Sequence, residues 1–194
     1  MNRILFLVAI IILPLPAISE EVTRNAGDKS LNFSFSDFAI EDYKIGIGGK
    51  YWFSPKITMT CIIDYQNTTS ELETSTGTPT QPETNFDSYG LSIGIERHFK
   101  SSTKLSPYLG GEIYYLDSES VVPGDFTSSF SEWGINVLFG AEYAFNKTIA
   151  FAAEYSLGYS DTESKINDTD SGTTTGTNKG FGLGSGKLLL LLYF

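Results

Sequence analysis

The sequence predicts an all-β protein, namely an eight-stranded antiparallel up-and-down transmembrane β-barrel. Three observations support this prediction. Apolar and polar residues alternate along eight segments of the chain, as in strands with one apolar and one polar face. Nearly all the bulky side chains fall on one of the two faces. Short turns alternate with longer polar connections, which is typical of membrane-spanning barrels.

The N-terminus has the composition of a secretory signal peptide. A single positive charge precedes the apolar run ILFLVAIIILPL, and the small residues Ala17 and Ser19 stand shortly before Glu20. An uncleaved helical anchor is the alternative, but two prolines interrupt the run and it is short for a membrane span. We therefore expect a signal peptide over 1–19 and a single barrel domain over 20–194.

The composition excludes several classes of function. The chain carries a formal net charge of -10, which argues against nucleic-acid binding because that function needs a basic surface. The single cysteine, Cys61, excludes an internal disulfide framework despite the predicted export. Cys61 falls on the apolar face of its strand, so we expect it to face lipid as a small apolar residue.

Each strand is predicted from apolar residues at every second position, a spacing that places them on one face. The strands are expected over 29–36, 43–53, 57–67, 86–99, 105–117, 131–145, 148–161 and 180–194. In chain order, their apolar faces include Phe33, Ile47, Ile63, Ile93, Ile113, Val137, Phe151 and Leu190. Short connections are expected near 37–42 and at 54–56, 100–104 and 146–147. Longer polar loops are expected over 68–84, 118–130 and 162–179.

The apolar face is predicted to point outward into lipid. It holds nearly all the large side chains, whereas the other face holds small residues and scattered charges. An eight-stranded barrel has an interior only just wide enough for side chains, so the bulky set would overcrowd it. The polar face is therefore expected inside, as a packed network of paired charges. Its members are Lys44, Lys50, Asp64, Glu96, Glu112, Glu142, Glu154 and Lys187. A carboxylate pair or an ion path is the alternative use for these side chains.

Aromatic residues mark the expected edges of the apolar band. At the long-loop ends of the strands we predict a girdle formed by Tyr43, Tyr65, Tyr89, Tyr115, Trp133 and Tyr159. Phenylalanines occupy the short-turn ends, ten residues along in two of the strands. At a rise of ~3.3 Å per residue and a tilt of ~40°, that spacing climbs ~25 Å, which is the height of the apolar band.

The chain finishes on the apolar stretch KLLLLLYF, which is predicted to close the barrel against the first strand. Alternate residues should face lipid, namely Leu188, Leu190, Leu192 and Phe194. Lys187 should face the lumen with Leu189, Leu191 and Tyr193. Phe181 and Leu183 carry the opposite parity, so a bulge or glycine kink is expected at 184–186.

Four strands end in the similar sequences KYWF, ERHF, EYAF and LLYF, and the last residue is phenylalanine. In these features the chain resembles the small eight-stranded outer-membrane barrels of Gram-negative bacteria, the OmpA/OmpX-like β-barrel domain. The resemblance implies residence in the outer membrane, in contact with its lipid and lipopolysaccharide. It also implies that Leu192, Tyr193 and Phe194 form the signal read by the barrel-assembly machinery, with periplasmic chaperones as further partners during biogenesis.

No catalytic, metal or cofactor site is expected. The only histidine, His98, is predicted at the short-turn rim of the lumen, where a structural polar residue is a better interpretation than a catalytic base. The segment NDTDSG (167–172) lacks the ligand spacing of a calcium loop. The predicted function is a structural or surface-interaction role through the loops 68–84, 118–130 and 162–179, which would meet a surface ligand. The alternative is a narrow channel or transport-related barrel with a charged lumen.

Overall fold

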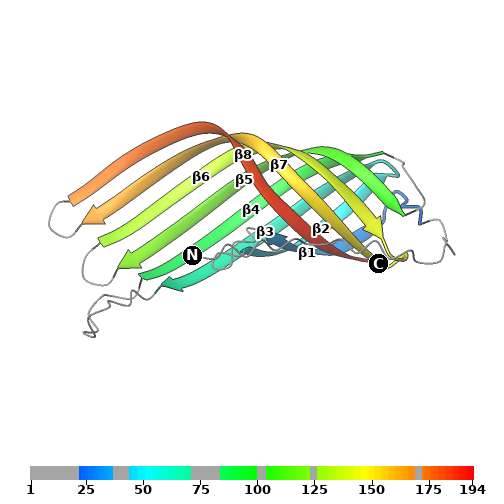
Figure 1. Cartoon of the computed structure of the whole chain (residues 1–194), viewed down its shortest axis with the longest axis horizontal. Coiled ribbons are helices and arrows are strands. Elements are labelled where there is room, and N and C mark those ends of the chain that lie inside the picture. The colour runs from blue at the N-terminus through cyan, green and yellow to red at the C-terminus, as the bar shows by residue number, and fades with distance from the viewer. Residues whose placement is uncertain (1–21, 37–43, 71–83, 100–103, 123–125, 169–171) are drawn as a thin grey trace, which may run out of the picture.

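The computed structural model describes residues 22–36, 44–70, 84–99, 104–122, 126–168 and 172–194. These residues form β1 (Lys29–Ser36), β2 (Lys44–Ser54), β3 (Ile57–Ser70), β4 (Thr84–His98), β5 (Leu105–Val122), β6 (Phe126–Ala144), β7 (Ile149–Asp168) and β8 (Gly172–Tyr193). Consecutive strands pair antiparallel, and β8 pairs with β1, so the sheet is a closed barrel (Figure 1). The predicted eight-stranded up-and-down barrel is confirmed. Among the described residues, no helix is long and apolar enough to cross a membrane.

The last strand closes the barrel in the predicted way. Leu31 of β1 lies opposite Leu192 of β8, and the pairing continues without interruption to Ser36 and Lys187. On its other side β8 shifts register, so that residues 184–185 together oppose Ser156 of β7. This two-against-one arrangement is a β-bulge at the place that the sequence predicts. It lets the apolar residues on both sides of the bulge face outward, although their spacing along β8 changes there.

Several strands continue farther than the sequence predicts. β7 and β8 remain paired up to Asp168 and Gly172, so most of the predicted loop 162–179 is strand. The predicted loop 118–130 is likewise mostly the ends of β5 and β6, which stay paired as far as Val122 and Phe126. Of the predicted loop 68–84, residues 71–83 lie outside the described part of the chain.

The physical reason for this difference is the loss of an apolar face above the lipid. Where both faces of a strand meet water, the apolar–polar alternation disappears although the backbone hydrogen-bond ladder continues. Threonine, which is the most frequent residue in 162–179, is β-branched and favours strands. The prediction therefore took these strand ends for loops because they are polar on both faces.

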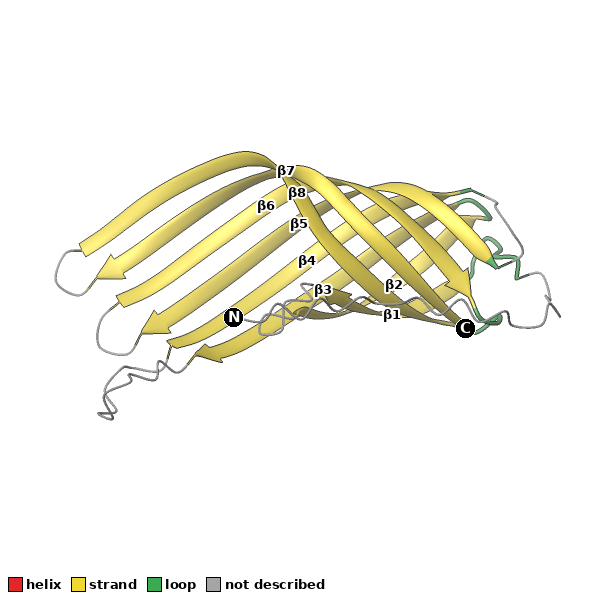
Figure 2. Cartoon of the chain, viewed as in Figure 1, coloured by secondary structure: helices red, strands yellow, loops and turns green. Residues whose placement is uncertain are grey.

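The barrel wall is consequently uneven in height (Figure 2). β1 has 8 residues and β8 has 22. In Figure 2 the ends of β3 to β8 project on one side beyond β1 and β2. The part of this projection that lies farthest from the short turns is called the extension. It is formed by 116–122 of β5, 126–132 of β6, 160–168 of β7 and 172–180 of β8.

The apolar face points outward, as predicted. Ile63, Ile95 and Ile113 expose 58%, 59% and 58% of their surface, whereas Asn32 and Thr58 on the opposite face are buried. Burying polar atoms while exposing large apolar side chains is favourable only where the surrounding medium is itself apolar. The wall is therefore built for contact with lipid rather than with water.

The interior differs from the predicted mixture of small and charged side chains. Trp52, Ile62, Tyr108 and Leu138 are all buried on the inward face. Glycines on neighbouring strands make room for them; a Cβ atom added at Gly140 would overlap the ring of Tyr108. One half of the lumen is thus filled by large side chains, as close packing requires.

Candidate functional site

The lumen holds two polar clusters that are separated by apolar side chains. The short-turn cluster lies at the end of the tight turns and comprises Arg24, Lys50, Glu96, His98, Glu142 and Tyr193. The long-strand cavity lies toward the extension. Along β3, β6 and β8, the buried positions between the two clusters are Ile62, Leu138 and Leu189.

Lys50 is the centre of the short-turn cluster. Its Nζ lies 2.8 Å from Glu96 Oε2 of β4 and 3.3 Å from Glu142 Oε2 of β6. All three side chains are at least 96% buried, and the single positive charge from β2 is shared by two carboxylates from other strands. Thr58 donates a further hydrogen bond of 3.1 Å to Glu96 Oε2. Buried charges are tolerated when they are paired and hydrogen-bonded in this way.

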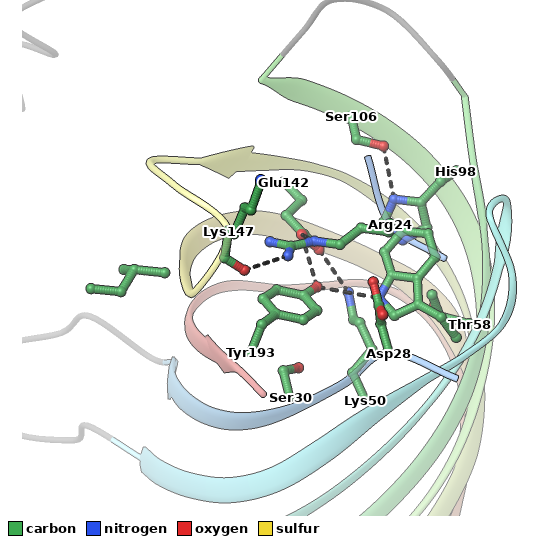
Figure 3. A network of polar contacts seen from close by, with 12 residues as sticks. Arg24, Asp28, Ser30, Lys50, Thr58, His98, Ser106, Glu142, Lys147 and Tyr193 are labelled. Atoms are coloured by element: carbon green, nitrogen blue, oxygen red, sulfur yellow. Dashed lines mark hydrogen bonds and ion pairs between the residues drawn. The ribbon is translucent and has the colours of Figure 1, made fainter. Parts of the chain in front are cut away.

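Glu142 also joins the C-terminal strand to the cluster. The Tyr193 hydroxyl donates a 2.8 Å hydrogen bond to Glu142 Oε1, and Trp52 Nε1 donates to the same hydroxyl at 3.4 Å. Arg24 lies over the ring of Tyr193, with its Cζ 3.3 Å from the ring centroid (Figure 3). Its Nε is 3.8 Å from Glu142 Oε1. Arg24 therefore supplies a second positive charge to the cluster.

Residues 22–28, which precede β1, hold Arg24 in this position; we call them the N-terminal strap. The amide of Gly27 donates to the Trp52 carbonyl at 2.8 Å, and the Trp52 amide donates to the Asp28 carbonyl at 3.0 Å. Arg24 Nη1 donates to the carbonyl of Lys147, in the turn between β6 and β7, at 2.7 Å. The strap thus spans the short-turn mouth of the barrel.

His98 occupies the cluster beside the mouth. Its Nε2 is 3.0 Å from Glu96 Oε2, and its Nδ1 is 2.9 Å from the hydroxyl of Ser106 (Figure 3). The order serine, histidine, carboxylate is the order of an activated nucleophile, its base and the group that orients the base. Here the carboxylate is also bound by Lys50, and the ring packs in tilted contacts against Trp52 and Tyr108 at centroid distances of 4.5 and 4.9 Å. These contacts favour a structural role, in which His98 links Glu96 to Ser106 by hydrogen bonds, over that of a catalytic base.

The long-strand cavity has a volume of ≈ 490 Å³. Lys187 lies at its base, with Nζ 3.5 Å from Glu112 Oε2 and 3.8 Å from Glu154 Oε1. Glu112 accepts a hydrogen bond from Asn136 Nδ2 at 3.1 Å, and Glu154 accepts one from the Tyr108 hydroxyl at 3.0 Å. Higher in the cavity, Glu132 accepts hydrogen bonds from the Tyr114 and Thr162 hydroxyls, both at 2.7 Å.

The eight charged residues singled out in the sequence thus fall into two groups rather than one. Lys50, Glu96 and Glu142 belong to the short-turn cluster. The long-strand cavity is lined by Lys44, Asp64, Glu112, Glu154 and Lys187. Asp64 accepts a hydrogen bond from the Ser34 hydroxyl at 3.0 Å.

Sequence reasoning missed two members of these groups. Arg24 precedes the first strand, where no alternation marks it, and Glu132 lies at the start of its predicted strand, one residue beyond the girdle residue Trp133. Glu132 could have been found from its position on the strand. It lies four residues from the inward-facing Asn136, so both side chains lie on the same face of β6. The only signal for Arg24 was a lone arginine between the predicted cleavage site and β1.

The residues of the predicted aromatic girdle lie on the outer face where the structure describes them. Tyr65 and Tyr89 pack against each other at a centroid distance of 5.1 Å, and Trp133 and Tyr159 at 6.4 Å. Tyr115 exposes 50% of its surface. The sixth residue, Tyr43, lies outside the described residues.

The three C-terminal residues have different surroundings. Tyr193 is buried in the short-turn cluster, whereas Phe194 exposes 83% of its surface. Leu192 lies opposite Leu31 in the closing pair of strands. The Phe194 amide donates a 3.1 Å hydrogen bond to the Lys29 carbonyl, which fixes the end of the chain against β1.

Within the described residues, no group of three or more histidine, cysteine, aspartate or glutamate side chains is placed to hold a metal ion. The segment 167–172, considered above as a calcium loop, falls partly outside those residues, because 169–171 are not described. Asn167 is bonded instead to its hairpin partner, since its Oδ1 accepts a 2.7 Å hydrogen bond from the Thr173 hydroxyl.

Comparison with known proteins agrees with this architecture. No curated protein matches the sequence significantly. Among solved structures, the outer membrane protein OprG from Pseudomonas aeruginosa has a TM-score of 0.63 at 14% identity, covering 90% of this chain and 99% of its own. Ail, the attachment invasion locus protein of Yersinia pestis, has a TM-score of 0.49 at 13% identity, with 87% and 99% covered. At 14% identity, the match to OprG shows similarity of fold alone.

The sequence itself gives the more specific result. The family model described as the outer membrane protein beta-barrel domain matches residues 5–186. That match includes nearly every strand, from β1 to the bulge in β8. The chain therefore belongs to the outer membrane protein β-barrel domain family.

Proposed function

We propose that this outer-membrane barrel is a non-conducting surface-interaction protein that acts through its extension. The observation that supports the proposal most strongly is the filling of the short-turn half of the lumen, which faces the periplasm in barrels of this type. Trp52, Tyr108 and Leu191 expose 2%, 4% and 0% of their surface there, and Lys50 of β2 is ion-paired across the lumen to Glu96 of β4 and Glu142 of β6. A charged solute crossing this half would have to displace a packed layer and break buried ion pairs.

The extension supplies the surface for such a role. Its outer face carries the ion pairs Asp161–Lys179 at 2.9 Å and Glu163–Lys165 at 3.0 Å. The hydrogen bond and the negative charge from Asp161 raise the pKa of Lys179, which is therefore charged at neutral pH. A shallow groove of ≈ 340 Å³ beside these pairs is lined in part by Trp133. Aromatic side chains are enriched at interfaces and polar groups form their rim, so an exposed tryptophan bordered by ion pairs supports a binding role for this surface.

Partners within the envelope follow from the same architecture. The apolar wall would contact outer-membrane lipid, and the outer face of the extension would meet lipopolysaccharide head groups. The exposed Phe194, with Leu192 and Tyr193, would serve as the signal for the assembly machinery, after chaperones have carried the chain across the periplasm. A predicted signal peptide at 1–19 provides the export step.

Planar bilayer recording tests the non-conducting state. We expect purified, folded protein to give no openings above the baseline at either polarity. Regular openings in the wild-type protein would overturn this part of the proposal and support a narrow channel with a charged lumen instead.

Shortening the extension tests the surface role. Removal of 163–177 would join β7 to β8 at Thr162 and Asn178, which are already paired, and would leave the membrane-embedded wall intact. We expect bacteria displaying the shortened protein to lose adhesion to cells and surfaces that the full-length protein confers. Unboiled gel migration of the variant verifies that its barrel has folded. Equal adhesion by a folded shortened variant would contradict the proposal.

A further inference from the structure

The long-strand cavity has a property that the surface role does not use, because its charges are unbalanced. Four carboxylate side chains line it, namely Asp64, Glu112, Glu132 and Glu154. Two ammonium groups line it, those of Lys44 and Lys187. The formal charge of the described lining is therefore −2. The short-turn cluster, by contrast, pairs Arg24 and Lys50 with Glu96 and Glu142 and is balanced.

The base of the cavity shows where one positive charge is missing. Lys187 is shared by Glu112 and Glu154 at 3.5 and 3.8 Å, which are loose contacts compared with the 2.8 Å pair of Lys50 and Glu96. The side chains of Glu112 and Glu154 are 92% and 94% buried. Neutral donors complete their hydrogen bonds, but a neutral donor does not cancel a charge.

In the upper part of the cavity, neutral groups bind the Glu132 carboxylate. Both oxygens of Glu132 accept hydrogen bonds from hydroxyl groups, those of Tyr114 and Thr162. Glu132 lies four positions along β6 from Asn136, which bonds Glu112 at the base. At ~3.3 Å per residue these two levels are ~13 Å apart along the strand. The excess negative charge is therefore spread along the cavity and does not converge on one point.

The space between these levels is open and polar. Serines and glycines contribute to its walls beside the charged residues, and a Cβ atom added at Gly182 would meet no atom within 4 Å. A volume of ≈ 490 Å³ lies within the range of small-molecule sites, which span roughly 300–1,000 Å³. The buried layer of Ile62, Leu138 and Leu189 lies beneath it, so a ligand would enter from the extension side.

We propose that this cavity binds a small linear organic dication of the diamine class. One ammonium group would lie at the base between Glu112 and Glu154, and the other would lie near Glu132. The hydroxyl-lined wall would accommodate the flexible chain between them. A single metal ion fits less well because the carboxylates are distributed along the cavity and form no metal-binding group among the described residues.

Calorimetric titration of the folded, detergent-solubilised full chain with a series of linear diamines, from putrescine to 1,8-diaminooctane, tests this site. We expect saturable binding that becomes tighter as the chain grows long enough to reach both levels, and no binding of the matching diols, from butanediol to octanediol, which lack the charges. Glu132→Gln should weaken binding by about tenfold or more, because a charge-assisted hydrogen bond contributes ~1.5–3 kcal/mol. Asp64→Asn is a second variant at the wall, with an expected loss in the same direction.

Glu163→Gln is the matched control. Glu163 carries the same charge on the outer face of the extension and is paired with Lys165 outside the cavity. We expect its affinity for the diamines to equal that of the wild type. Gel migration without boiling verifies that every variant is folded.

Three results would overturn the proposal. The first is the absence of saturable binding to the folded wild-type protein, which would mean that protons or bulk ions balance the cavity. The second is equal binding of the matching diols. The third is an equal loss of affinity in Glu132→Gln and Glu163→Gln, which would indicate attraction to the net charge of the whole protein. None of these results depends on whether the extension mediates adhesion.

Discussion

At Lys50, a single side chain supplies the charge that pairs two buried carboxylates in the short-turn half of the lumen. Its ammonium group contacts Glu96 and Glu142, which come from β4 and β6 and are both buried. The Tyr108 ring lies beside it, with Nζ 5.2 Å from the ring centroid. Without this charge two carboxylates would face each other across an apolar layer, and that arrangement is costly in a medium of low dielectric constant.

Lys50→Met tests this dependence. The variant retains the length of the side chain but removes the charge, so we expect the free energy of unfolding to fall by about 3–5 kcal/mol, as when one partner of a buried ion pair is removed. Reversible urea unfolding in lipid vesicles measures the change. Lys165→Met, at an exposed pair on the extension, should leave stability unchanged. A Lys50→Met protein as stable as the wild type would show that the pairing is dispensable.

Two glycines of the same cavity wall give a second residue-scale prediction. A Cβ atom at Gly158 would overlap Asn136 and the Ile135 carbonyl, whereas one at Gly182 would meet nothing within 4 Å. We expect Gly158→Ala to destabilise the barrel by about 1–3 kcal/mol through overpacking. Gly182→Ala should be tolerated in the same urea titration. Similar losses in both variants would mean that strand propensity, rather than space, determines the effect.

At the scale of elements, the N-terminal strap connects parts of the barrel that the strand ladder does not join directly. It bonds to β2 through Trp52, to the β6–β7 turn through Lys147 and to β8 through the ring of Tyr193. These contacts exist together only when β8 has paired with β1. The strap therefore acts as a latch on the completed cylinder.

Arg24→Ala tests the latch. The variant would lose the charged hydrogen bond from Arg24 Nη1 to the Lys147 carbonyl and the second cation near Glu142, so we expect a loss of about 2 kcal/mol, the scale of a hydrogen bond that involves a charged group. The temperature at which unboiled protein loses its folded migration on a gel should fall accordingly. Arg97→Ala is the control, because Arg97 is an exposed arginine on the outer face of β4. A larger fall in the control would contradict the latch.

At the scale of the whole molecule, the outward apolar wall determines the medium in which the protein can fold. Residues such as Ile45, Ile95 and Ile135 expose about half of their surface around the cylinder, where lipid would cover them. We expect the protein to require detergent or lipid to remain monomeric and to migrate differently on a gel before and after boiling. A folded monomer in plain buffer would contradict the outward orientation.

The sequence by itself determined the fold class, the closing role of the last strand and the bulge near 184–186. These features depend on period-two alternation, which is local and which lipid enforces on one face of every spanning strand. It also assigned the charged residues of the spanning strands to the inner face. It did not determine the heights of β5 to β8, because a polar strand in water has no apolar face to reveal it.

Only the tertiary structure decided how the lumen is divided. The contacts of Lys50 and Lys187 depend on the stagger between strands that are distant in sequence, and no local pattern encodes that stagger. The positions of Arg24 and Glu132 depend on closure of the cylinder, which brings the strap across one mouth and the extension above the other. The closed, balanced periplasmic half and the open, negatively charged cavity therefore arise from how the strands are assembled.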